Sequence, residues 1–101
     1  MEKTNLLKMT SQEMRMMRRL LKNAQKWQIN CPEDESRHVD FSRQSSEATK
    51  WCSLDCTKFG KDGKIEASFS YAIFTNHILV EINRDDVCDD PEQAFAKFLA
   101  L

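Results

Sequence analysis

The chain has 101 residues, of which 31% are charged, and it carries a formal net charge of −1 with only two glycines and two prolines. This size permits one domain with a single sheet and two covering helices, and the composition excludes a low-complexity or linker-rich chain. No apolar run approaches the ~20 residues of a membrane span, and the N-terminus lacks a signal-peptide core, so we expect a cytoplasmic protein.

Charge is unevenly distributed along the chain. Residues 1–30 hold seven basic and two acidic side chains, a net of +5, and residues 64–101 hold three basic and seven acidic ones, a net of −4. The middle, residues 31–63, holds five basic and seven acidic side chains, a net of −2. A basic half and an acidic half can bind separate partners, or each other in an oligomer.

The first predicted element is an amphipathic helix that follows a mobile arm over residues 1–9 and opens a single domain over residues 10–101. Thr10 and Glu13 have the spacing of a capping box, and Asn30 followed by Pro32 ends the helix. Between these ends, one apolar stripe recurs at intervals of three and four residues: Met14, Met17, Leu20, Leu21, Ala24 and Trp27.

The polar side of this helix is strongly basic and consists of Arg15, Arg18, Arg19, Lys22 and Lys26. Such a face could bind the phosphates of a nucleic acid or an acidic patch on a protein. It could equally be a solvated face whose long stems shield apolar neighbours. No aromatic residue lies among the charges to stack on bases.

The polar segment after the helix contains the alternation of a short edge strand at residues 37–42, where Val39 and Phe41 alternate with polar residues. His38 and Asp40 share a face of that strand, but no nucleophile accompanies them. The sequence also lacks a Gly-rich phosphate loop, a paired-carboxylate motif and a serine elbow, so we expect no enzymatic activity.

Three antiparallel strands are predicted between residues 49 and 83, at 49–59, 64–74 and 77–83. The first two are joined by the Gly-rich turn Gly60–Gly63, and the last two by Thr75 and Asn76. The middle strand alternates strictly, with Ile65, Ala67, Phe69, Tyr71 and Ile73 on one face.

Folding about the two turns predicts which residues of this sheet lie opposite each other. The first turn sets Cys56 opposite Ala67, Leu54 opposite Phe69 and Cys52 opposite Tyr71. The second sets Ile73 opposite Ile78, Tyr71 opposite Val80 and Phe69 opposite Ile82. Every pair on this face is apolar, so the register is strongly specified.

The four cysteines do not have the spacing of a disulfide or a zinc site. Cys52 and Cys56 lie on one strand, where four residues hold them about 13 Å apart, too far for a disulfide or a shared metal. Both fall on the apolar face, where a free cysteine packs as a small hydrophobe. We expect structural thiols, no metal and no cofactor, as suits a reducing cytoplasm.

The opposite face of the sheet is apolar at one end and polar at the other. The predicted pairing sets Trp51, Ala72 and Leu79 in one row, with Phe74 and His77 beside it. Asp55, Ser68, Ser70 and Glu81 occupy the far end. An apolar row on a wet face is typical of an interface. The alternative is that the first helix, or the arm with Leu6, Leu7 and Met9, covers the row.

A second amphipathic helix closes the chain, with Asp90 as N-cap, Pro91 at the first position and an apolar stripe of Ala94, Phe95, Phe98 and Leu99. The segment before it is acidic, with Asp85, Asp86, Asp89 and Asp90. Complementarity to the helix N-terminus explains Asp89 and Asp90 but not Asp85 and Asp86. The acidic segment could also dock on a basic protein or mimic a nucleic acid.

These elements predict an α+β domain with an antiparallel sheet of three or four strands and two helices on one face. Double-stranded-RNA-binding domains share the order helix, three strands, helix, but the acidic start of the last helix here would repel phosphates, so the order alone does not indicate that family. We expect a small binding protein that modulates or inhibits a protein partner, with a homodimer possible. The alternative is a nucleic-acid-binding protein that uses the basic helix.

Overall fold

The computed structural model describes residues 11–45, 50–74 and 78–101. Along the chain, one helix comes before the strands and one comes after them, and the fold is α+β, as the sequence predicts. The helices are α1 (Ser11–Ile29) and α2 (Pro91–Leu99), and the strands are β1 (Ser36–Ser45), β2 (Lys50–Phe59), β3 (Ile65–Phe74), β4 (Ile78–Ile82) and β5 (Asp86–Val87). The predicted arm, the capping residue Thr10, the Thr75-Asn76 turn and His77 lie outside the described residues.

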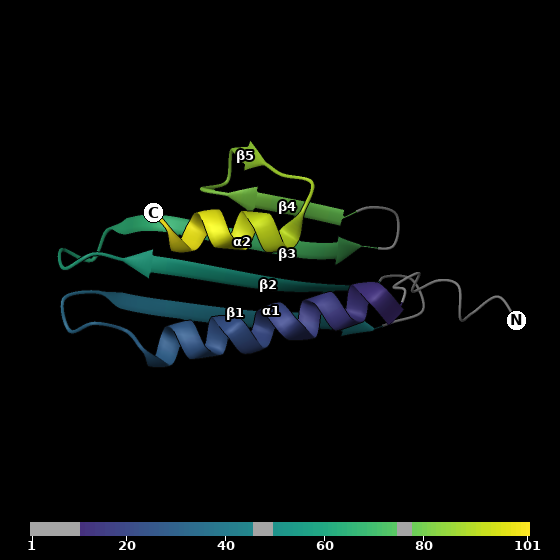
Figure 1. The fold of residues 1–101 in the computed structure, drawn as a ribbon, viewed down its shortest axis with the longest axis horizontal. Coiled ribbons are helices and arrows are strands. Elements are labelled where there is room, and N and C mark those ends of the chain that lie inside the picture. The colour runs from purple at the N-terminus through teal and green to yellow at the C-terminus, as the bar shows by residue number, and fades with distance from the viewer. Residues whose placement is uncertain (1–10, 46–49, 75–77) are drawn as a thin grey trace, which may run out of the picture.

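The strands form one antiparallel sheet in the order β1-β2-β3-β4-β5, so every strand pairs with its neighbour in sequence (Figure 1). The edge strand expected at residues 37–42 is present and longer, and it pairs with β2 over its whole length. The two-residue strand β5 is not among the predicted elements. Within the described part of the chain, no helix is long and apolar enough to cross a bilayer.

The predicted pairing of β3 with β4 is confirmed, with Ile73 opposite Ile78, Tyr71 opposite Val80 and Phe69 opposite Ile82. The predicted pairing of β2 with β3 is wrong by two residues: Cys56 lies opposite Phe69 rather than Ala67.

A bulge next to the turn explains the difference. Phe59 pairs with Ile65, but Lys58 pairs with Ala67, so Glu66 is an extra residue on β3. Without the bulge, Cys56 would face Ser68 and the apolar face of β2 would meet polar residues. The bulge therefore restores the match between apolar faces, at a register two residues beyond the predicted one.

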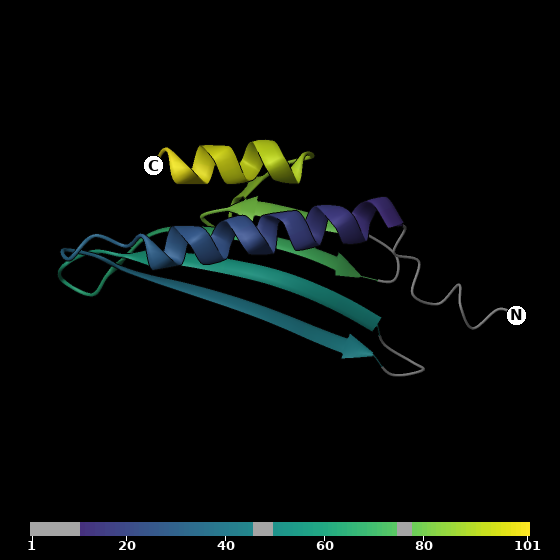
Figure 2. The ribbon, with the colours of Figure 1, turned by 60° about the horizontal axis from the view of Figure 1, so that its bottom comes forward.

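Both helices pack on the face of the sheet that carries Cys52, Leu54 and Cys56 of β2 and Phe69, Tyr71 and Ile73 of β3. Helix α1 lies over β1 and β2, and α2 lies over β3 and β4 (Figures 1 and 2). The predicted stripe of α1 is buried at Met17, Leu20 and Ala24.

Aromatic rings join the two helices and the sheet in this core. Phe95 of α2 meets Phe69 of β3 edge-on, with ring centroids 5.2 Å apart. Phe98 meets Trp27 of α1 at the same distance. Such edge-to-face pairs are a favoured ring geometry and add to the stabilisation from apolar burial. The two helices are thus fixed to the sheet and to each other.

Candidate interaction surface

The sheet has two faces with different surroundings. Figure 2 shows both helices on one side of it, and we call the opposite side the outer face. No helix among residues 11–45, 50–74 and 78–101 packs on the outer face. Its chemistry is therefore set by the outward-pointing residues of β1 to β4.

Four apolar side chains gather at one end of the outer face. Trp51 lies opposite Phe74, and Ala72 lies opposite Leu79. Trp51, Phe74 and Leu79 are half-buried, and the small Ala72 is buried among its neighbours. We call Trp51, Ala72, Phe74 and Leu79 the apolar patch. The sequence predicts these members, but it sets Trp51 opposite Ala72, whereas the bulge moves Ser53 into that place.

An acidic row crosses the same face next to the patch. Asp40 of β1 lies opposite Asp55 of β2, which lies opposite Ser70 of β3, which lies opposite Glu81 of β4. We call these four residues the acidic row. Asp40 and Asp55 are direct cross-strand neighbours, and like charges in such positions repel each other, whereas Ser70 separates Asp55 from Glu81.

Hydroxyl groups hold two of these carboxylates in place. Ser70 donates to Asp55 Oδ1 over 2.6 Å, and Ser53 donates to Asp55 Oδ2 over 3.4 Å. On the adjacent strand, Ser42 donates to Asp40 Oδ2 over 3.2 Å. The sequence predicts Asp55, Ser70 and Glu81 at this end of the outer face. It does not predict Asp40 there, because the position of Asp40 depends on how β1 pairs with β2.

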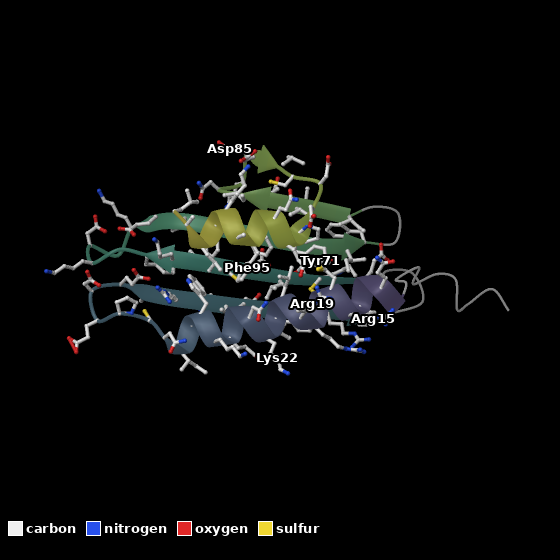
Figure 3. All side chains as sticks on the ribbon, viewed as in Figure 1. Arg15, Arg19, Lys22, Tyr71, Asp85 and Phe95 are labelled. Carbon is white, nitrogen blue, oxygen red and sulfur yellow. The ribbon has the colours of Figure 1, made fainter. Side chains whose placement is uncertain are left out.

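The basic face of α1 points away from the sheet. Its residues Arg15, Arg18, Arg19, Lys22 and Lys26 are all exposed. Figure 3 shows Arg19 on the side of α1 toward α2, where its Nη1 donates to Glu92 Oε2 over 2.6 Å. This ion pair joins the two helices across the surface. Because both side chains are about half exposed, at 54% and 45%, it contributes at most about 1 kcal/mol.

The predicted acidic segment divides into two parts. Asp90 caps α2, since its Oδ1 accepts from the N–H of Glu92 over 2.9 Å and from that of Gln93 over 3.4 Å. Asp85 and Asp86 lie at the β4–β5 hairpin, where they are exposed, and Asp89 is exposed before the cap. Figure 3 places Asp85 at the β5 edge of the molecule, far from the basic side of α1.

The four cysteines are free thiols. Burial raises the pKa of Cys56 to about 12, helped by the neighbouring Asp55 carboxylate, and burial also raises the pKa of Cys52 above its usual value. A thiol of raised pKa is a poor nucleophile and a poor metal ligand at neutral pH. Within the described residues, no group of three or more His, Cys, Asp or Glu side chains is arranged to hold a metal.

No family model, no curated protein and no solved structure matches this chain.

Proposed function

We propose that this chain is a small, non-enzymatic cytoplasmic binding protein that modulates or inhibits a protein partner through its outer sheet face. The observation that carries the proposal is the apolar patch on the outer face, on which neither of the two described helices packs. Tryptophan and large apolar residues that cluster on an uncovered face are typical of interface centres, whereas scattered ones are common on any surface.

The acidic row favours a particular kind of partner. It lies next to the apolar patch and carries three carboxylates with no Lys or Arg in the row. A protein with an apolar centre and basic residues beside it would be complementary in both respects. A second copy of this chain fits less well, because its basic face lies on α1, on the other side of the sheet. We therefore favour a different, basic protein over a homodimer.

Partner capture tests the proposal. The immobilised chain is used to capture proteins from the source cell, and each purified candidate is then titrated against the parent chain and Leu79→Asp. We expect at least a thirtyfold loss of affinity from Leu79→Asp, since truncating a central interface residue commonly costs about 2 kcal/mol. Lys61→Asp, an exposed change in the β2–β3 turn, is the control and should bind as tightly as the parent. Equal binding by Leu79→Asp and the parent would contradict the proposal.

A nucleic-acid-binding protein is the second candidate. The exposed basic face of α1 supports it, because Arg15, Arg18 and Lys22 are all exposed there and the one acidic residue of this helix is Glu13 in its first turn. Against it stand the absence of aromatic residues among these charges and the acidic chemistry of the outer face.

A further inference from the structure

Strand β1 forms one edge of the sheet, on the side opposite β5 (Figure 1). It has ten residues, contains no proline, glycine or lysine, and pairs with β2 without a bulge. An edge strand presents unpaired N–H and C=O groups to its surroundings, and proteins usually blunt such an edge with a short strand, proline, lysine or a bulge. Strand β1 has none of these features, so its backbone can accept a further strand.

Helix α1 approaches this edge at one end only. There, Gln28 Nε2 donates to the carbonyl oxygen of Arg37 over 3.1 Å, so a side chain of the helix takes the place of a neighbouring strand. Toward the other end of β1 the helix diverges from the edge (Figures 1 and 2). Carbonyl groups alternate in direction along a strand, so those of Val39, Phe41 and Arg43 point to the same side as that of Arg37. This part of β1 is where an added strand could pair.

The side chains of this part of β1 alternate between the two faces of the sheet. Phe41 lies on the helix-covered face, opposite the fully buried Leu54, and is itself 39% exposed. Arg43 points to the same face and is also exposed. Asp40 is exposed on the outer face, where the acidic row begins. A strand beside β1 would therefore meet an aromatic ring and a cation on one face and a carboxylate on the other.

A second copy of β1 does not match this pattern. Two β1 strands in one continuous antiparallel sheet keep their faces, so each residue can lie opposite only residues of its own face. Arg43 shares its face with no acidic residue of β1. The one register that places a basic residue opposite Asp40 pairs it with His38. That register also needs the Arg37 carbonyl group, which Gln28 occupies.

We propose that an extended segment of the basic protein partner adds to the sheet as an antiparallel strand beside residues 39–43. Its residue opposite Asp40 is Lys or Arg, its residue opposite Phe41 is apolar, and its residue opposite Arg43 is Asp or Glu. In strand addition, main-chain hydrogen bonds supply affinity and the alternating side chains supply specificity. The inference rests on the proposed function, because the added strand brings its basic residue to the acidic row on the outer face.

Two end-blocked peptides of the same composition test the pattern. The matched peptide is Thr-Glu-Thr-Val-Lys-Val-Thr, which places Lys opposite Asp40 and Glu opposite Arg43, and the swapped peptide exchanges its Glu and Lys. In ¹⁵N–¹H spectra of the whole chain, the matched peptide should shift the N–H signals of Val39, Phe41 and Arg43. It should bind at least about tenfold more tightly than the swapped peptide, in which both ion pairs become like-charge contacts. Equal binding, or no shift with about 2 mM matched peptide, would overturn the proposal.

A reciprocal variant tests the register without changing the net charge. Asp40→Lys combined with Arg43→Glu alters two exposed positions and should prefer the swapped peptide by about the same factor. Any other preference would show that these two contacts do not determine binding and would overturn the proposal. Val39→Pro removes an N–H group at the edge. If the parent sediments as a dimer that Val39→Pro converts to a monomer, a second copy occupies the edge and the proposal is wrong.

Leu79→Asp separates this inference from the proposed function. Leu79 lies in the apolar patch on β4, away from β1, so this variant should bind the matched peptide as the parent does. If the parent does not bind the matched peptide but Leu79→Asp weakens partner binding, only the strand addition fails. If the peptide binds as expected but Leu79→Asp binds the partner normally, the proposed function of the patch fails instead.

Discussion

Arg37 shows how one residue joins elements that are distant in sequence. Its Nη1 donates to the carbonyl oxygen of Trp27 over 2.6 Å, near the C-terminal end of α1, and its Nε donates to Glu35 Oε2 over 2.5 Å. Its guanidinium carbon lies 4.9 Å from the centre of the Trp27 ring. The carbonyl groups in the last turn of a helix have no partner within the helix, and the Arg37 guanidinium group donates to one of them. Positive charge is also favourable at this end of a helix. The sequence places Arg37 on an edge strand but does not reveal this contact.

The thiols give a prediction at the scale of single residues. Because burial raises the pKa of Cys56 to about 12, only about one thiol in 10⁴ is ionised at pH 8, and Cys52 is affected in the same direction. Cys31 and Cys88 are half-buried. With a disulfide reagent at pH 8, two thiols should therefore react rapidly and two at least about a hundredfold more slowly. Denaturant should make all four equivalent.

Peptide mapping of the modified cysteines provides the control for this experiment. The fast pair should be Cys31 and Cys88, and raising the pH should speed the slow pair, because ionisation increases toward the raised pKa values. Four equal rates in the native protein would contradict the burial of β2.

At the scale of elements, the sequence predicts most of the fold because several signals agree. Helix α2 begins where Asp90 and Pro91 predict it, and β3 pairs with β4 as the apolar faces require. The shift between β2 and β3 could not be found in this way. Shifting β2 by two residues along β3 leaves every side chain on the same side of the sheet, so the pattern of apolar residues fits both registers equally well. The bulge at Glu66 selects the register that the structure shows.

Strand β5 could not be found for a different reason. It has two residues and lies in an acidic segment without apolar alternation. Its hairpin depends on two left-handed residues, Asn83 at φ 55° and Arg84 at φ 70°. Asn83 tolerates this conformation, and its Oδ1 accepts from the N–H of Ser68 over 3.0 Å. Asparagine after an apolar strand is thus the one local signal for this turn.

Helix α1 provides the test between the two candidate functions. The proposed function predicts no binding of a DNA or RNA duplex, or of a single strand, at about 50 mM salt, where electrostatic binding is strong. The comparison variant is Arg15→Glu, Arg18→Glu and Lys22→Glu together, which omits Arg19 because of its pairing with Glu92.

The matched control for α1 reverses three exposed lysines elsewhere, Lys61, Lys64 and Lys97. Both triple variants change the net charge by the same amount. The parent chain and the control variant could both bind nucleic acid while the α1 variant does not. That result would establish the nucleic-acid-binding function and contradict the protein-binding proposal.

At the scale of the whole molecule, three surfaces of different chemistry are kept apart. The basic face lies on α1, the acidic segment on the β4–β5 side, and the apolar patch with the acidic row on the outer face. The sequence predicts the membership of each surface from periodicity. It predicts both helices on one face of the sheet, but it leaves open whether the first helix instead covers the apolar row on the other face, because that row also offers an apolar surface. The acidic row likewise depends on the register of all four strands.

The most direct test of the outer face compares two neighbours on β4 that point to opposite sides of the sheet. Val80 is 2% exposed in the core, and Leu79 is half-buried in the apolar patch. A buried carboxylate is strongly destabilising, whereas one at a protein surface is tolerated. Thermal unfolding should therefore show Leu79→Asp within a few degrees of the parent and Val80→Asp largely unfolded. If Leu79→Asp unfolds the chain as Val80→Asp does, the patch belongs to the core and the outer face is not a binding surface.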